Sequence, residues 1–373
     1  RPGVFAGATI VFIWSFTELG TPLMFDYYGV APVQIFYRLK EVENSAEPYA
    51  LTIVLLAAAV GMYILGKLVF GGKAYAMYSK ASRASAEKDL SRGAGLLASA
   101  AFALVTCLAV LPHLGVLLTS VSVEGRWYGT VIPAAFTGDH YRQALTASDS
   151  FGSIVNSIKY ASAAVVVDLG LGVLIGYLLV RTTVRGRGLL DALCMLPLAV
   201  PGLVLAFGYV AMSQRWPMGK SGPLGDLILG ADPNPVPLLV VAYAVRRLPY
   251  IVRSTVAGLE QTSGELEEAA VNLGASRFTA VRRVIVPLIM ANLIAGGLLV
   301  FSFSMLEVSD SMILAQQSRH YPITRAIFAF TERLGDGAYI ASAMGAWGMA
   351  LLTVTLVGAS AILGKKLGSI FRV

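Results

Sequence analysis

The sequence has little charge and almost no cysteine or histidine. Only 14% of its 373 residues are charged, whereas soluble domains carry about 25%, so a water-soluble globule is disfavoured. The two cysteines, Cys107 and Cys194, lie in apolar runs, which indicates buried thiols in two different helices rather than a disulfide framework. His113, His140 and His320 are scattered, so the sequence predicts neither a metal site nor a cofactor in this chain.

Hydrophobic residues make up 56% of the chain, and its mean hydropathy is +0.69. The 38 glycines and 16 prolines fit membrane helices, in which both residues are more frequent than in soluble helices. Because about 20 apolar residues cross one bilayer, the sequence predicts an all-α, polytopic membrane helix bundle with about eight transmembrane helices. The predicted spans lie near residues 5–25, 49–71, 94–120, 153–180, 189–212, 235–255, 291–314 and 338–363.

Lys and Arg residues are distributed unequally between the segments that join these spans. Alternate segments hold 17 of them on one side and 9 on the other. The positive-inside rule makes the richer side cytoplasmic, together with both ends of the chain. The basic balance therefore reflects membrane topology rather than nucleic-acid binding. The predicted cytoplasmic segments are 72–93, 181–188, 246–284 and 365–373.

The chain also matches itself at an offset of 289 residues, where residues 7–25 align with residues 296–314. Identities among apolar residues arise by chance in membrane helices, but the aligned pair Glu18/Glu307 is informative because carboxylates within spans are rare. Further identities follow when the offset grows by one, at Pro32/Pro322 and Tyr49/Tyr339.

A tandem duplication explains this match. Residues 1–71 are then the last two transmembrane helices of a first copy, and residues 72–93 are a polar cytoplasmic linker. Residues 94–373 are a complete second copy with six transmembrane helices. Two such copies side by side imply a pathway between them, as in transporters built from repeats.

Several polar or helix-breaking residues within the predicted spans are candidates for that pathway. Ionisable groups at membrane depth usually have a function, although each can also simply accept hydrogen bonds from neighbouring helices. The prolines remove backbone donors and predict a kinked helix, which lines the pathway, acts as a gate or serves only packing. The candidates are Glu18, Glu307, Asp310, Asp168, Pro197 and Pro201.

Two features of the predicted external loops have alternative explanations. The pairs His140–Tyr141 and His320–Tyr321 are either part of a docking surface or ordinary loop residues. The fragment 218–221 (MGKS) resembles the end of a phosphate-binding loop, but Gln214 stands where its first glycine is required. The sequence therefore predicts that this chain is not itself an ATPase.

The stretch 263–288 (SGELEEAAVNLGASRFTAVRRVIVPL) predicts a helix, a turn and a second helix on the cytoplasmic side. Thr262 and Glu265 have the spacing of a capping box, Gly274 suits the position after a helix end, and Ser276 can cap the second helix before Pro287. An ordinary surface hairpin would have the same pattern. A predicted apolar stripe runs through Leu259, Leu266, Ala270 and Leu273.

The same stretch resembles the EAA loop of the inner-membrane permease subunits of ABC importers. Glu268-Ala269-Ala270 is followed after three residues by Gly274 and later by Val284-Ile285-Val286-Pro287, where the family prefers Ile and Leu to the two valines. Asn156-Ser157, Pro197–Gly202 (PLAVPG) and Arg247-Leu248-Pro249-Tyr250 agree with the resemblance. It covers residues 94–373, and the repeat extends it to residues 1–71.

The resemblance implies the type I importer permease fold and a passive pathway in a bacterial inner membrane. Two ATP-binding subunits would dock at the cytoplasmic loop, and a periplasmic or lipid-anchored solute-binding protein would dock outside. Among such permeases, the fused two-copy layout and the Arg247-Leu248-Pro249-Tyr250 stretch resemble those for ferric iron most, with those for phosphonates, polyamines and thiamine close behind. The residues that the resemblance assigns to the ATPase-coupling loop are Glu267, Glu268, Ala269, Ala270, Gly274 and Pro287.

Two other classes remain open from the sequence. An ion-coupled secondary transporter also uses internal repeats and intramembrane carboxylates, but needs no coupling loop. A membrane-embedded enzyme needs convergent catalytic groups, which three scattered histidines do not supply.

Overall fold

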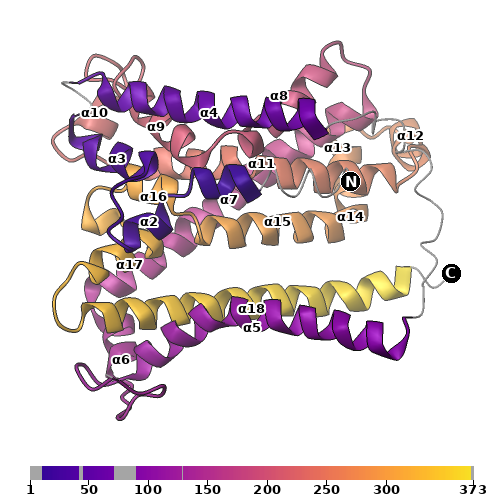
Figure 1. Ribbon diagram of the computed structural model, residues 1–373. Helices are drawn as coiled ribbons and strands as arrows, with labels where there is room; N and C mark the ends of the chain where they lie inside the picture. Colours follow the sequence, from indigo (N-terminus) through magenta and orange to yellow (C-terminus); the bar gives the residue numbers. More distant parts are fainter. Residues whose placement is uncertain (1–10, 42–44, 71–89, 128, 371–373) are drawn as a thin grey trace.

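The computed structural model describes residues 11–41, 45–70, 90–127 and 129–370, and regular structure in this part is helical apart from one isolated bridge between Ser122 and Phe136. The predicted all-α class is confirmed (Figure 1). The linker predicted at 72–93 lies almost entirely outside the described residues, as do residues 1–10. The longest helices are α4 (Glu47–Phe70), α5 (Arg92–Val121), α7 (Ser148–Arg181), α11 (Val236–Glu260) and α18 (Gly337–Ile370).

Shorter helices complete the bundle and its two ends. They are α2 (Gly20–Met24), α3 (Ala31–Tyr37), α6 (Asp139–Thr146), α8 (Arg187–Ala199), α9 (Gly202–Ser213), α10 (Gly225–Leu229), α12 (Glu265–Asn272), α13 (Arg277–Ala280), α14 (Val286–Leu288), α15 (Met290–Met305), α16 (Ser309–Leu314) and α17 (Ile323–Thr331). Single turns are η1 (Arg38–Glu41), η4 (Ser318–His320) and the π-helical η3 (Val281–Ile285).

Fewer helices than the predicted eight are long and apolar enough to cross a membrane by themselves. Among the described residues three qualify, within α5, α7 and α18, and up to five if each of two bent pairs counts as one span. The pair α8 and α9 bends by 104°, so the kink predicted from the two prolines in the span 189–212 is confirmed, as a break between two helices. Pro201, which has no N–H to donate, precedes α9 at this bend. The second bend, of 78°, precedes α15.

The predicted span 291–314 is also interrupted. Helix α15 ends at Met305, residues 306–308 are not helical, and α16 begins at Ser309. The expectation that Glu307 lies in mid-helix is therefore wrong. The same sequence of elements occurs early in the chain, where residues 11–16 are helical, residues 17–19 form a break around Glu18, and α2 follows. We call these segments the first break (17–19) and the second break (306–308).

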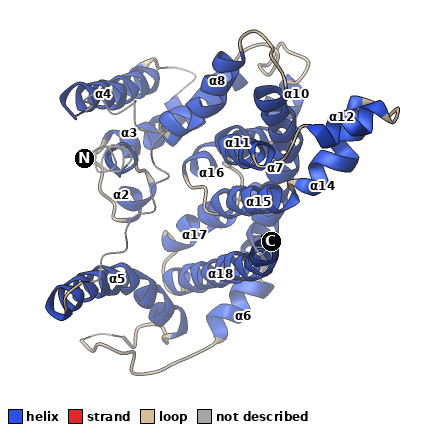
Figure 2. Cartoon of the chain, turned by 90° about the vertical axis from the view of Figure 1, so that its right-hand side faces the viewer, coloured by secondary structure: helices blue, strands red, loops and turns tan. Residues whose placement is uncertain are grey.

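The centre of the bundle is formed by α7, α11 and α15, whose axes lie side by side (Figure 2). Glycines allow this close approach: a Cβ atom on Gly172 would lie 2.2 Å from the Ile251 side chain, and one on Gly176 would lie 2.5 Å from Thr255. Small residues spaced by four are a usual means of packing helices in membranes.

The predicted two sides of the membrane correspond to the two ends of the bundle. In Figure 1, α12, α13, the start of α5 and the end of α18 lie at the right, whereas α3, α6, α10 and α17 lie at the left. The boundary of one predicted cytoplasmic segment, 246–284, is wrong. Arg246 and Arg247 belong to the middle of α11, and their side chains are only 18% and 13% exposed.

Candidate functional site

The predicted cytoplasmic hairpin is present and consists of α12 and α13. Its start differs from the prediction, because Gly264 caps α12 without a side-chain bond and the backbone N–H of Glu265 donates to Ser263 Oγ at 3.2 Å. The capping box of Thr262 and Glu265 is therefore wrong. Thr262 instead closes α11, where its hydroxyl donates to the Leu259 carbonyl at 3.1 Å.

The turn of the hairpin agrees with the prediction. Gly274 has a φ of +91°, a conformation that favours glycine. The N–H of Gly274 donates to the Val271 carbonyl at 2.9 Å, and that of Ala275 donates to the Ala270 carbonyl at 3.1 Å, the pair of bonds of a Schellman motif. Ser276 caps α13 as predicted, since its Oγ accepts from the Thr279 N–H at 3.2 Å.

The two adjacent acids of the hairpin have different surroundings. Glu267 is mostly buried: its Oε1 accepts a bond from the Tyr177 hydroxyl, and its Oε2 lies 4.0 Å from Arg181 Nε. Arg181 also donates to the carbonyl oxygens of Leu259 and Thr262, at 3.1 and 2.7 Å. Glu267 therefore fastens α12 to the end of α7, whereas Glu268 is exposed. The sequence analysis missed Tyr177 and Arg181, whose position at the end of a span was the available signal.

The exposed part of the hairpin is rich in apolar side chains. Leu273 is 90% exposed and Phe278 is 74% exposed, and Ala269 and Pro287 are also exposed while Ala270 is partly so. Leu259, which the sequence placed on the same stripe, is instead fully buried in α11. Neighbouring exposed apolar groups on a polar projection are typical of a surface that another protein covers.

A second region of interest is a group of buried charges, Arg246, Arg247, Glu307 and Asp310, which we call the charge cluster. Arg246 Nη1 lies 3.0 Å from Glu307 Oε1 and 3.4 Å from Asp310 Oδ2. Arg247 pairs with Glu307 Oε2 and donates to the Phe303 carbonyl at 3.1 Å. Both acids are almost completely buried. Two helices thus meet through compensating charges that would be costly to bury alone.

Hydroxyl groups fix the backbone of the second break inside this cluster. The Glu307 carbonyl accepts bonds from Ser311 Oγ at 2.6 Å and from Thr324 Oγ1 at 2.7 Å. The Tyr243 hydroxyl bonds Ser311 Oγ at 2.6 Å, which joins α11 to α16. The break is therefore held by residues from α11, α16 and α17, and its free carbonyl has partners.

The bend between α8 and α9 touches the charge cluster. A Cβ on Gly202 would lie 1.7 Å from Arg246 Nη2, so the guanidinium occupies the space that any other residue would need. Pro197 lies within α8, and Pro201 lies at the bend itself. Of the predicted pathway residues, the structure thus brings Glu307, Asp310 and Pro201 together.

Glu18 lies apart from these charges. It is exposed, and its Oε1 accepts a bond from the N–H of Gly20 at 2.9 Å. A Cβ on Gly20 would lie 3.3 Å from Val308, so the start of α2, directly after the first break, lies against the second break. The two glutamates therefore belong to neighbouring segments but have different environments.

The family described as "Binding-protein-dependent transport system inner membrane component" matches residues 168–368, which include the hairpin and the charge cluster. The chain belongs to this family. Two solved bacterial alginate ABC transporters have a similar fold, one in complex with an alginate-bound periplasmic protein. The first has a TM-score of 0.53 at 16% sequence identity, and the match covers 72% of this chain and 96% of that one. The complex has a TM-score of 0.51 at 17% identity, and the match covers 71% of this chain and 93% of that one.

The curated relatives of this chain differ in the solute that their names state. The ferric transport system permease protein FbpB of Actinobacillus pleuropneumoniae is 25% identical over 91% of this chain, which spans 47% of FbpB. The molybdenum permease ModB of Escherichia coli is 27% identical over 59% of this chain and 94% of its own length. The putative 2-aminoethylphosphonate permease PhnV of Salmonella typhimurium is 26% identical over 75% of this chain and 94% of its own length. The chain thus spans about half of its ferric relatives.

Asp168 lies beside the charge cluster, where Arg247 interacts with it electrostatically, and the remaining predicted residues lie elsewhere. Asp168 is fully buried in α7, and neither of its carboxylate oxygens has a hydrogen-bond partner in the described part of the chain. His140 is buried against Tyr339 and bonds the Ser122 carbonyl at 3.0 Å, so it is not part of an outer surface. Cys194 is buried as expected, but Cys107 is exposed on α5.

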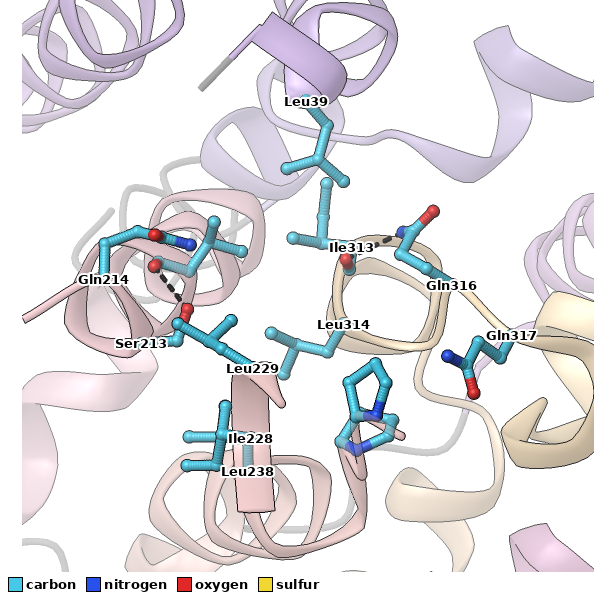
Figure 3. A pocket seen from close by; sticks show the side chains of 13 residues that line it. Leu39, Ser213, Gln214, Ile228, Leu229, Leu238, Ile313, Leu314, Gln316 and Gln317 are labelled. Atoms are coloured by element: carbon cyan, nitrogen blue, oxygen red, sulfur yellow. Dashed lines mark hydrogen bonds between the residues drawn. The ribbon is translucent and has the colours of Figure 1, made fainter. Parts of the chain in front are cut away.

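A cavity of about 320 Å³ opens among α9, α10, α16 and η1, at the predicted outer end (Figure 3). Its walls are mainly apolar, with leucine, isoleucine and proline side chains, and Leu39 reaches it from the first stretch of the chain. Its polar groups are Ser213, Gln214, Gln316 and Gln317. Among the described residues, those that line this cavity are all uncharged.

Proposed function

We propose that this chain is part of the membrane pathway of an ATP-driven importer, which moves a small solute from a binding protein into the cytoplasm. The chain itself catalyses no reaction; two ATP-binding subunits at the cytoplasmic face hydrolyse ATP, and a periplasmic or lipid-anchored binding protein docks at the opposite face. Both ends of this stretch would lie in the cytoplasm of a bacterium. The observation that supports this best is the rigid, apolar-tipped hairpin within the residues that match the family.

The position of the hairpin would allow an ATPase subunit bound to it to displace the helices of the bundle. Glu268, Ala269 and Gly274 present small or charged groups to a partner. Glu267 fixes the hairpin to α7 through Tyr177 and Arg181, and Pro287 lies exposed in α14, after the hairpin. Helix α11 runs from this end to the charge cluster, so a displacement of the hairpin reaches the second break through α7 and α11.

The proposed layout supports a pathway between two related halves. Residues 1–71 would be the end of a first copy, 72–93 a linker and 94–373 a second copy. The same series of elements occurs twice in the chain: a break, a short helix, a second helix and a long helix. The first series is the first break with α2, α3 and α4, and the second is the second break with α16, α17 and α18. The start of α2, directly after the first break, lies against Val308 of the second break, which fits two related halves around a shared axis.

Ferric iron is the first solute to test, because FbpB matches nearly the whole of this chain. The names of similar proteins also state molybdenum and 2-aminoethylphosphonate, and these are the next solutes to test. Identities near 25% do not rank the three.

The test of the proposed function compares two glycines with the same φ of +91°, Gly274 and Gly186. A Cβ on either would meet nothing within 4 Å, so Gly274→Asp and Gly186→Asp impose similar local strain. The native assembly is reconstituted in liposomes with its ATPase and its binding protein. We expect Gly274→Asp to reduce ATP hydrolysis stimulated by the binding protein at least tenfold, and Gly186→Asp to change it less than twofold. Equal effects of the two variants would contradict the role of the hairpin.

The competing function is an ion-coupled secondary transporter, for which the unpartnered carboxylate of Asp168 is the motivating observation. In that case transport would follow an ion gradient without ATP, and Gly274→Asp would leave it intact. Measuring uptake with ATP alone and with an ion gradient alone separates the two functions.

A further inference from the structure

Arg325 is a cation with no counter-charge among the described residues. It lies in the first turn of α17, and its guanidinium carbon is 4.7 Å from the ring centroid of Tyr321 and 5.5 Å from that of Phe328. Its Nε and Nη1 atoms are buried and donate to no described group. None of the ion pairs among the described residues includes Arg325.

The other partly buried arginines of the described residues each pair with an acid, whereas several exposed arginines pair with none; the paired ones are Arg38, Arg181, Arg246 and Arg247. Arg246 and Arg247 are paired with buried acids, and Arg319 and Arg333 near α17 pair with Asp232 and Asp336. Stacking on aromatic rings contributes about 0.5–2 kcal/mol to a cation, which offsets only part of the cost of removing a guanidinium from water. Burial and then the neighbouring Arg319 lower the pKa of His320, which disfavours its charged form.

The place of Arg325 in the fold links it to the proposed pathway. One face of α17, with Ile323 and Ala326, packs against α18. Arg325 lies one turn before Phe328, whose ring is 6.2 Å from that of Phe36 in α3. Arg325 therefore lies within one helical turn of a contact between the early stretch and the rest of the chain.

Only the later of the two similar stretches has a charged residue at this position. Aligning Pro32 with Pro322 places Arg325 opposite Ile35, which is fully buried and apolar. An arginine that served only packing between two similar stretches would have no need to differ from an isoleucine in this way.

We infer that Arg325 is an anion-binding residue on the pathway, and that the transported solute is an oxyanion or a metal complex with oxyanion ligands. A planar guanidinium with unused donors matches the oxygen atoms of such anions, and the flanking rings hold its plane in position. The inference rests on the proposed function, because it takes the contact between the two stretches as the pathway.

The experiment measures equilibrium binding of radiolabelled molybdate, inorganic phosphate and ferric citrate to the full-length protein in lipid nanodiscs, at high sodium chloride. The variants are Arg325→Gln, Arg325→Lys and the control Arg333→Gln, which removes a paired arginine near the end of the same helix. We expect saturable binding of at least one probe, weakened at least tenfold by Arg325→Gln, about threefold by Arg325→Lys and not at all by Arg333→Gln. Preference for molybdate or phosphate indicates a free oxyanion, and preference for ferric citrate indicates a complex.

Unchanged binding in Arg325→Gln, or no binding of any probe to the wild type, would overturn the inference. Arg325→Lys covers the case in which Arg325→Gln fails to fold, because it keeps the charge but loses the planar fork, and binding equal to the wild type would again refute the role. The Gly274→Asp experiment is independent of this one. Coupled hydrolysis without anion binding rejects only the inference, whereas the absence of an ATPase partner rejects the proposed function.

Discussion

Glu18 and Glu307 occupy the same place in two similar stretches of the chain. Each follows a helix, lies in a break and precedes a short helix, and each side chain accepts a bond from a backbone N–H two or three residues later. Their surroundings differ: Glu307 is 4% exposed and paired with two arginines, whereas Glu18 is exposed and forms no described ion pair.

The difference shows that a glutamate at this position can have two separate roles, one within its own break and one in joining distant helices. In both breaks it satisfies an N–H at the start of the next short helix, which needs no other part of the fold. Only in the second break does it also compensate two cations on α11. The two glutamates therefore have different roles in the fold, and substitutions can separate them.

The largest expected effect follows from removing the charge of each glutamate. Glu307→Gln leaves two buried guanidinium groups with one acid, Asp310, and breaking a buried pair usually costs about 3–5 kcal/mol. Glu18→Gln keeps an acceptor for the Gly20 N–H and should change the free energy of unfolding by less than about 0.5 kcal/mol. Equilibrium unfolding in mixed micelles measures both. Similar losses would show that Glu18 also has a buried cationic partner in the full protein.

A smaller effect is expected from filling the space beside the charge cluster. Gly202→Ala places a methyl group where Arg246 lies, and such overpacking costs about 1–3 kcal/mol. The matched control is Gly208→Ala in the same helix, where a Cβ meets nothing within 4 Å and the change should be neutral or stabilising by up to about 1 kcal/mol. The same unfolding measurement applies. If Gly202→Ala is as stable as Gly208→Ala, Arg246 is mobile and the cluster is not a fixed support for the second break.

The sequence predicted the parts of this molecule that depend on local chemistry. Gly274 and Ser276 set the turn of the hairpin through bonds to residues within five positions, and such rules are visible in the sequence. The capping box at Thr262 failed because α11 continues to Glu260 and uses Thr262 at its own end. Local rules place a helix end correctly only when no longer helix competes for the same residue.

The charge cluster was only partly predictable, because its members come from distant positions. The sequence marked Glu307 and Asp310 as unusual carboxylates, but it assigned Arg246 and Arg247 to a loop by counting positive charges. A count of Lys and Arg residues does not distinguish an arginine in a loop from a buried one that is paired with an acid. An arginine within a span is tolerated when acids from another helix reach it. Two adjacent arginines before a proline, with two acids 60 residues later, were the available signal.

The smallest expected effect concerns the backbone of the second break. Thr324→Val keeps the shape of the side chain but removes the bond to the Glu307 carbonyl, which retains its bond from Ser311. A net loss of about 1 kcal/mol is expected for one such bond. The equivalent position in the first stretch is Gln34, which is exposed and bonds the Tyr28 carbonyl at 3.4 Å, so Gln34→Ala should change stability by less than about 0.5 kcal/mol. Because both variants leave every described charge in place, a large loss for Thr324→Val would mean that the geometry of the break, and not its charge, maintains the contact between α11 and α16.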